Sequence, residues 1–484
     1  MVACCPIVGL TALGAVLLLP ERPEVWAAAA VAASAAALGA GRPSRNRAAA
    51  VLACLGIGFA LGAAGSQRLA VRSASAFTSL PVHRVAFYGG VALADSTKTS
   101  DGGSFHRAAL THVSTDSAEA SARGRAVLFD PSGRLLSRGQ LFEAVGSLER
   151  ADRTCTVDFS GAVARLAVRG FASRRLRLRW SVRQGLDRLI GRFGFPASSL
   201  FRALFLGVRE EMQPRAAAAF ERTGTLHVLA LSGLHVGIIS FLIYGLLFPL
   251  SGRWVKWVVV MAVLVFYLFL AGPRPSLTRA VLFLLFTGVA RLLDRDRRPL
   301  NTLSLTLITV LMIAPQDAFS LSFQLSFLAM AGILTVGRWL AYLLAPYVPR
   351  LAGLPLSCTV GAQTAVLPLA LASFGVFYPS AIIATPLLIP LVTLFLWSGL
   401  LFLPLAALNA AVAERIMALS MNGLYRSIMA VVGFLARFPG LSGPWVLYGW
   451  CGLVAAILGC LLYNAVHRRT WGSSRWITEA WITA

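Results

Sequence analysis

The sequence has few of the residues that build metal sites, disulfides or nucleotide-binding loops. Its seven cysteines form no Cys-x-x-Cys pair, and its six histidines show no metal-ligand spacing. The long hydrophilic region holds Cys155 alone, so it cannot close an internal disulfide. A Gly-x-x-x-x-Gly-Lys stretch for nucleotide phosphates is also missing. These absences leave no catalytic residue, metal or cofactor to name, and we do not expect the chain to be an enzyme.

Charged residues are scarce, and acidic residues are the scarcest. Asp and Glu number 20 against 44 Lys and Arg, which gives a net charge of +24, and lysine occurs only as Lys98 and Lys256. Hydrophobic residues make up 57% of the chain. They fall in blocks of about 16 to 25 residues, which is long enough to cross a bilayer. This composition excludes a soluble protein and indicates a polytopic membrane protein with a large excess of arginine. Arginine suits phosphate binding, although cytoplasmic loops and contacts with lipid headgroups explain the same excess.

The apolar blocks predict about 11 membrane crossings in two groups. Residues 1–65 hold the first three, and a basic connector with Arg42, Arg45 and Arg47 marks a cytoplasmic turn between the second and third. Residues 66–197 are then external. Residues 198–466 hold the later crossings, and residues 467–484 form a short basic tail. Within the second group, Val412 to Leu435 has the charged and Met-rich character of a flat or re-entrant helix.

The external region differs in kind from the apolar blocks around it. Short apolar runs such as Ala126 to Phe129 are separated by clusters of Gly, Ser, Asp and Pro, which is typical of a small β-barrel or sandwich. Leu141 to Leu148 predicts a further strand, and Asp130 to Gly133 has the chemistry of a turn. The predicted fold is an α-helical polytopic membrane protein with an external β-rich domain inserted after the third crossing.

A basic stretch ends this domain. Arg175, Arg177 and Arg179 alternate with apolar residues, so that on a strand they share one face, and Arg183 follows on a predicted helix. Such a stripe would track a phosphate backbone, as a DNA-binding stretch does. A solvated strand face and a contact with anionic lipid fit the pattern equally well.

Among the apolar stretches, the one that holds the most polar side chains runs from Gly224 to Gly237. On one continuous helix His227 and His235 lie about 80° apart and Ser232 about 60° from His235, so the three share a broad face. Polar side chains at membrane depth turn toward other helices or a water-filled path. Gly233 and Gly237 add a spacing that lets a second helix approach closely. Both a translocation path and a purely structural hydrogen bond between helices explain the histidines.

This stretch and three later ones resemble the ComEC competence-protein family. Thr225 to Gly237 is similar to the family signature, Pro275 to Ala280 to its Pro-Ser-x-x-Arg-Ala element, and Phe323 to Ala329 to its Phe-Gln-Leu-Ser-Phe segment. Gln363 and the pair Pro386 and Pro390 fit its later helices. One departure is Ala384, where the family usually has an asparagine.

The resemblance implies a channel in the cytoplasmic (inner) membrane that passes single-stranded DNA during natural transformation, with the β-rich region as an OB-like domain. The implied DNA path contains polar and basic residues of the four stretches: His227, Ser232, His235, Arg274, Arg279, Gln324 and Gln363. Arginines that snorkel at a helix end would explain Arg274 and Arg279 without DNA.

The resemblance also implies partners. These are single-stranded DNA, membrane lipids, a separate DNA receptor and a cytoplasmic helicase-like motor, and an oligomer is compatible with it. Family members often carry a metallo-β-lactamase-like domain, but the histidines here form no His-x-His-x-Asp-His cluster. We therefore expect a form without that domain, with any nuclease on another chain.

Two rival functions come from other classes. One is a transporter of a small molecule or lipid intermediate on the same scaffold, which predicts a substrate-dependent flux and no effect on DNA uptake. The other is a non-transporting membrane scaffold, in which changes at His235 or Arg279 matter only when they lower the amount of protein.

Overall fold

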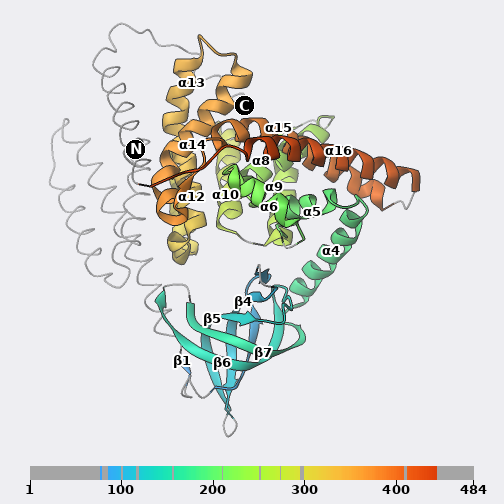
Figure 1. Cartoon of the computed structure of the whole chain (residues 1–484), viewed down its shortest axis with the longest axis vertical. Coiled ribbons are helices and arrows are strands. Elements are labelled where there is room, and N and C mark those ends of the chain that lie inside the picture. The colour runs from blue at the N-terminus through green and yellow to red at the C-terminus, as the bar shows by residue number, and fades with distance from the viewer. Residues whose placement is uncertain are drawn as a thin grey trace, which may run out of the picture.

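A computed structural model of the chain has a β part and a helical part that are joined by one long helix, α4 (Arg174–Gly191) (Figure 1). The predicted crossings in residues 1–65 and near 444–466, and the tail 467–484, lie outside the described residues. The structure describes residues 77–78, 85–99, 102–115, 119–154, 157–209, 211–249, 252–272, 274–294, 299–407 and 411–443.

Within these residues the β part is a sheet that closes on itself. Strand β5 pairs with β4 on one side and, in parallel, with β7 on the other, and the order β5, β7, β6, β2, β4 returns to β5. Closure removes the exposed edges that make open sheets prone to aggregation. The strands are β1 (Phe77–Thr78), β2 (Phe87–Ala92), β3 (Thr97–Lys98), β4 (Ser104–Ser114), β5 (Glu119–Asp130), β6 (Gln140–Thr154) and β7 (Val157–Phe171).

The sequence explains these strands through alternation and turn chemistry. Alternate residues of β4 point into the core, as expected where one face of a sheet is buried. The predicted strand at Leu141 to Leu148 is confirmed within β6. The predicted turn is confirmed too, since the Asp130 carboxylate accepts from the Ser132 amide at 2.8 Å and Gly133 takes a φ of 69°.

A polar cluster lies inside the β part. His106 is fully buried, with Nδ1 2.5 Å from the Ser96 hydroxyl and Nε2 3.2 Å from the Ser104 hydroxyl. The Asp130 carboxylate is 3.8 Å from Nε2. Burial lowers the pKa of His106 from its usual 6.5, and the charge and hydrogen bond of Asp130 oppose this only in part. Burial of this polar cluster therefore favours the neutral form of His106.

The helical part contains several helices that are suited to a membrane. By length and composition six of those described could cross one: α9, α10, the run from Leu321 to Leu344, α14, α15, and Glu414–Leu435 of α16. The elements are α5 (Ala197–Phe201), η2 (Arg202–Leu206), α6 (Pro214–Arg222), α7 (Leu226–Leu229), α8 (Gly233–Leu246), α9 (Arg253–Ala271), α10 (Pro275–Leu292), α11 (Pro299–Ile313), η3 (Pro315–Phe319), α12 (Leu321–Gly332), η4 (Ile333–Gly337), α13 (Arg338–Leu344), α14 (Arg350–Phe374), α15 (Ala381–Ala406) and α16 (Ala411–Leu435). A short ladder pairs β8 (Val376–Phe377) with β9 (Leu441–Ser442).

Three segments differ from the predicted pattern of crossings. The central motif, which begins the later group of predicted crossings, is divided, and its helix α8 has only 14 residues. Helix α11, with 15 residues, is also shorter than a full span. By contrast, α16 contains a 22-residue segment that is long and apolar enough to cross, where the sequence favours a flat or re-entrant helix.

Close glycine contacts join α12 and η4 to α14. A Cβ at Gly332 would lie 2.2 Å from the Gly361 carbonyl oxygen, and a Cβ at Gly361 would lie 2.5 Å from the Gly337 amide. No side chain fits at these distances, so the backbones themselves touch. Small residues allow such crossings between helices in a membrane, where van der Waals packing drives association.

Candidate functional site

The central polar motif is not one helix. After the single turn of α7 the chain is extended at Ala230 and Ser232, and α8 then begins at Gly233. The predicted common face of His227, Ser232 and His235 is therefore wrong. The physical reason is the cap: Ser232 accepts from the Leu234 amide at 3.3 Å, and the His235 ring accepts from the Ser232 amide at 3.2 Å.

The break separates the two histidines. His227 lies on α7 with an exposed side chain, and its Nδ1 is 3.1 Å from the Gly224 carbonyl. His235 is fully buried at the start of α8, and its Nε2 has no hydrogen-bond partner among the described residues. Only His235 is therefore part of a buried site.

The glycines of the motif behave differently from each other. A Cβ on Gly233 would lie 3.3 Å from both the Ala280 Cβ and an Arg279 nitrogen, so this glycine lets α8 approach α10. A Cβ on Gly237 would meet no atom of the described residues within 4 Å. Gly233 therefore lies where α8 comes close to α10, whereas a side chain at position 237 would enter open space among the described residues.

Arg279 is the most unusual residue of this site. Its side chain is 5% exposed on α10, and its Nε has no hydrogen-bond partner among the described residues. The guanidinium lies over the Phe327 ring, with Cζ 5.6 Å from the ring centre. No described carboxylate lies within ion-pair distance of it. A buried cation that lies over an aromatic ring, with no described carboxylate beside it, can accept an anion.

Arg274 and Ser276 fix the start of α10 beside the motif. The Ser276 hydroxyl donates to the Leu231 carbonyl at 2.7 Å, and Arg274 donates to the Gly207 carbonyl at 3.3 Å. Gly207 takes a φ of 73°, and a Cβ there would lie 2.7 Å from an Arg274 nitrogen. The N-termini of α8 and α10 are therefore held together. Helix N-termini carry partial positive charge and favour anions.

The two predicted glutamines lie elsewhere. Gln324 donates to the Ala318 carbonyl at 2.9 Å and ties α12 to the preceding η3 turn, which is a structural contact. Gln363 is half-buried in α14. Within the described residues neither glutamine is hydrogen-bonded to His235 or Arg279, so the geometry gathers Ser232, His235, Arg274 and Arg279 but not the glutamines.

The basic stretch is helical, so the predicted strand face of Arg175, Arg177 and Arg179 is wrong. Ser173 caps α4 by accepting from the Leu176 amide at 3.3 Å, and seven alternating residues are too few to outweigh the helical spacing that follows. Arg175 and Arg177 are exposed, whereas Arg179 is 2% exposed. Arg179 and Arg183 both bind the Asp95 carboxylate.

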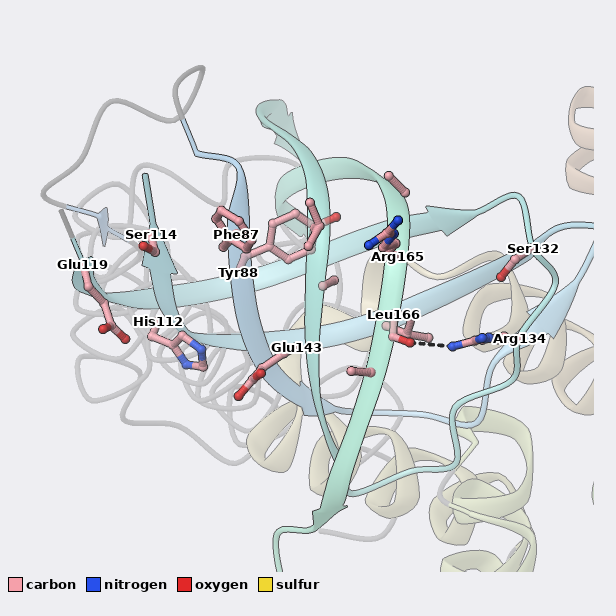
Figure 2. Close-up of a pocket in the computed structure, with 14 residues that line it drawn as sticks. Phe87, Tyr88, His112, Ser114, Glu119, Ser132, Arg134, Glu143, Arg165 and Leu166 are labelled. Carbon is pink, nitrogen blue, oxygen red and sulfur yellow. Dashed lines mark hydrogen bonds between the residues drawn. The ribbon is translucent and has the colours of Figure 1, made fainter. Parts of the chain in front are cut away.

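The β part has a cavity of about 720 Å³ on its sheet (Figure 2). Arg134 and Arg165 lie toward one end, and His112 and Glu119 toward the other, with Tyr88 between them. Arg134 donates to the Leu166 carbonyl at 2.6 Å, and Phe87 is 46% exposed at the rim. The cavity thus joins arginine side chains to an aromatic surface.

Sequence reasoning missed three residues that matter here. Asp95 binds arginines 84 and 88 positions further along the chain, a distance at which no local spacing gives a signal. Phe327 was noted only as part of a motif, and its place under Arg279 follows from tertiary packing. Gly207 was not singled out, although a glycine between two short helical segments is a usual signal of a positive φ.

Comparison with known proteins gives a consistent family match. Residues 204–470 match the model of the family described as Competence protein. The chain is 29% identical over 285 residues to an uncharacterized protein of Aquifex aeolicus, 26% over 210 residues to the uncharacterized protein YcaI of Escherichia coli, and 30% over 132 residues to ComE operon protein 3 of Bacillus subtilis.

The matches cover only parts of these relatives. They include 58%, 41% and 27% of this chain and 63%, 28% and 17% of the respective relatives. No solved structure matches the chain.

Proposed function

Because the chain belongs to the Competence protein family, we propose that it passes single-stranded DNA across the cytoplasmic membrane during natural transformation. The observation that carries this proposal is Arg279, a buried arginine with no described carboxylate partner, next to the N-terminus of α8. A passing phosphate would supply the missing negative charge.

Desolvation makes the charge of Arg279 unfavourable without a partner. A buried charge costs several kcal/mol unless a partner compensates it, and the Phe327 ring supplies only about 0.5 to 2 kcal/mol. A phosphate at Arg279 would receive two parallel hydrogen bonds from the guanidinium and the favourable ends of α8 and α10. His235 Nε2, which is also unpartnered among the described residues, is a second group that a phosphate or its water shell would satisfy.

The β part would receive the strand on the external side as an OB-like domain. Support comes from its closed ring of strands with one parallel pair, β5 with β7, an arrangement suited to small barrels that bind oligonucleotides. The exposed Phe87 ring offers a stacking surface, and Arg134 and Arg165 offer positive charge. Arg175 and Arg177, which are exposed on α4, would extend this surface toward the helical part.

The proposal requires partners, because the sequence has no nucleotide-binding loop to drive movement. A cytoplasmic helicase-like motor would pull the strand, and a separate receptor would deliver it. A transporter of small molecules or lipid intermediates, or a scaffold without transport, remains the rival to be tested.

The test is entry of fluorescent DNA into the cytoplasm of a deletion strain that carries wild-type or variant chain at matched abundance. We expect Arg279→Gln to lower uptake about 10- to 100-fold, as loss of one charged hydrogen-bonding contact does. Arg279→Lys keeps the charge without the planar guanidinium, so its uptake should lie between that of the wild type and that of Arg279→Gln. Arg350→Gln, at an exposed arginine that begins α14, is the control and should leave uptake unchanged.

Two results would overturn the proposal. Normal uptake with Arg279→Gln would remove Arg279 from the DNA path. Normal uptake in the deletion strain itself would exclude DNA passage and favour the transporter or the scaffold.

A further inference from the structure

Helix α4 connects the β part to the helical part, and it carries an arginine contact near each end (Figure 1). Its first residues follow β7 directly, and its last residues lead into the buried α5 and η2 segments. A helix of this length is stiff, so contacts at its two ends decide how the two parts sit relative to each other.

Arg179 joins three segments that are distant in sequence. Its Nη2 and Nη1 donate to the Asp95 carboxylate at 2.7 and 3.1 Å, in the loop between β2 and β3. Its Nε lies 2.9 Å from the Phe269 carbonyl and 3.1 Å from the Leu270 carbonyl, at the C-terminal end of α9. The side chain is 2% exposed. One guanidinium therefore connects the β part, α4 and α9.

Asp95 is held from the other side as well. Its carboxylate accepts from the Arg138 amide at 2.9 Å and from Arg183, one helical turn beyond Arg179. Burial alone would raise the pKa of Asp95, but the Arg179 hydrogen bond and the charges of Arg183 and Arg179 outweigh it and hold that pKa far below its usual value. The neighbouring Ser96 hydroxyl accepts from the Leu136 amide at 2.9 Å and so ties the loop to the sheet.

The other end of α4 is fixed in a similar way. Arg192 donates to the Ala406 carbonyl at the end of α15 and forms an ion pair with Glu414 at 3.2 Å. The Asn422 side chain accepts from the Ala197 amide at 3.3 Å. The last carbonyls of a helix lack partners within that helix, and cations are favoured there. Arg179 in α4 and Arg192 at its C-cap thus both donate to carbonyls at the C-terminal ends of other helices.

The contact of Arg179 lies next to the candidate site. The α9 end that it binds is followed by Gly272, where a Cβ would lie 3.3 Å from an Arg179 nitrogen, and then by Arg274 at the start of α10. Helix α10 carries Arg279. A displacement of the β part would therefore be transmitted through few residues to the helix that holds the buried arginine.

We propose that Arg179 is a positioning residue that, through Asp95 and the end of α9, fixes the β part relative to the α8–α10 site. Its importance for transport rests on the proposed function, but its positioning role does not. In this arrangement Arg179 does not contact DNA, and the β part delivers its ligand to one defined place on the helical part.

The first test measures position without DNA. Spin labels are placed at exposed Glu149 on β6 and exposed Ser420 on α16, in a full chain without its native cysteines. Pulsed electron paramagnetic resonance then measures the distance between the two parts. We expect a single narrow distance for the parent chain and for the control Arg188→Lys, an exposed arginine on the same helix. Arg179→Lys and Asp95→Asn should lose the narrow distance, and Asp95→Glu, which keeps the carboxylate, should restore much of it.

The second test measures uptake by the same variants at matched abundance. The proposal predicts that uptake falls in parallel with loss of the narrow distance. An unchanged distance in Arg179→Lys and Asp95→Asn overturns it, whatever happens to uptake. If the distance broadens as expected and the parent chain supports no DNA uptake, the positioning role stands and the proposed function fails.

Discussion

At the scale of single residues, His106 makes the β part sensitive to acid. Its burial lowers its pKa below the 6.5 of an unfolded chain. Below about pH 6.5, His106 binds a proton in the unfolded chain but not yet in the folded chain. The stability that His106 contributes to the β part is therefore fully present above that pH and falls as the pH decreases.

Hydrogen exchange of peptides from β4 and β5 in the full chain would measure this effect, with rates corrected for pH. Protection should decrease between pH 6.5 and 5 in the parent chain. His106→Gln should lower protection at both values and remove the difference between them. The matched control is His112→Gln, at a half-buried histidine on the same strand, which should keep the parent's pH dependence. Equal protection of the parent chain at the two pH values would contradict the role of His106 in the acid sensitivity of the β part.

At the scale of elements, the glycine contacts between α12, η4 and α14 give a direct prediction. Gly361→Ala places a methyl group where the Gly337 amide lies 2.5 Å away, so the helices must separate. We expect a loss of about 1 to 3 kcal/mol, as for overpacking of a well-packed interior. Thermal unfolding in detergent would report it as a lower midpoint.

The control is Gly423→Ala on α16, where a Cβ would meet no described atom within 4 Å. Replacing an open helical glycine by alanine should stabilise the helix by about 0.5 to 1 kcal/mol. The two substitutions should therefore move the midpoint in opposite directions, and a shift of the same sign and size in both would show that the close contact is not important.

Some helices and strands could be predicted from the sequence alone, and others could not. The β-rich character of the region after residue 66 and the turn at Asp130 could be predicted because alternation and Asp-Pro-Ser-Gly chemistry act locally. The break at Ala230 could not be seen in hydropathy, because the residues on both sides are apolar; Ser232 three positions before His235 was the available signal. The helix at Arg175 was mistaken for a strand because a short alternating run fits both periods.

Tertiary pairing explains the rest of the site. That Arg279 would be buried over Phe327, and that Arg179 would bind Asp95 and not solvent, depends on contacts between residues 48 and 84 positions apart. No spacing rule covers such distances. The motif identified the stretches that carry the site, and the fold decided which of their side chains meet.

At the scale of the whole molecule, binding of single-stranded DNA should depend steeply on salt and little on sequence. Each phosphate contact contributes a slope of about −0.7 in log affinity against log salt, so the double variant Arg175→Gln and Arg177→Gln should reduce the slope by about 1.4. Fluorescence anisotropy of a labelled oligonucleotide with the full chain in detergent measures it.

A double variant of the exposed Arg215 and Arg350, on helices away from α4, serves as the charge-matched control. Its slope should remain that of the parent. If both pairs change the slope equally, the salt dependence reflects the net charge of the protein. Arg175 and Arg177 then do not form a defined DNA-binding surface beside the β part.

The buried charge at Arg279 also bears on how a cell could keep its membrane energised. A fixed positive charge in a surrounding of low dielectric repels sodium ions and protons while it attracts phosphate. On the proposed route, an opening past Arg279 wide enough for a thin polyanion would therefore still oppose the inward leak of cations. Replacing Arg279 by a neutral residue would remove that barrier. The proton-motive force would then decay faster in cells that are taking up DNA.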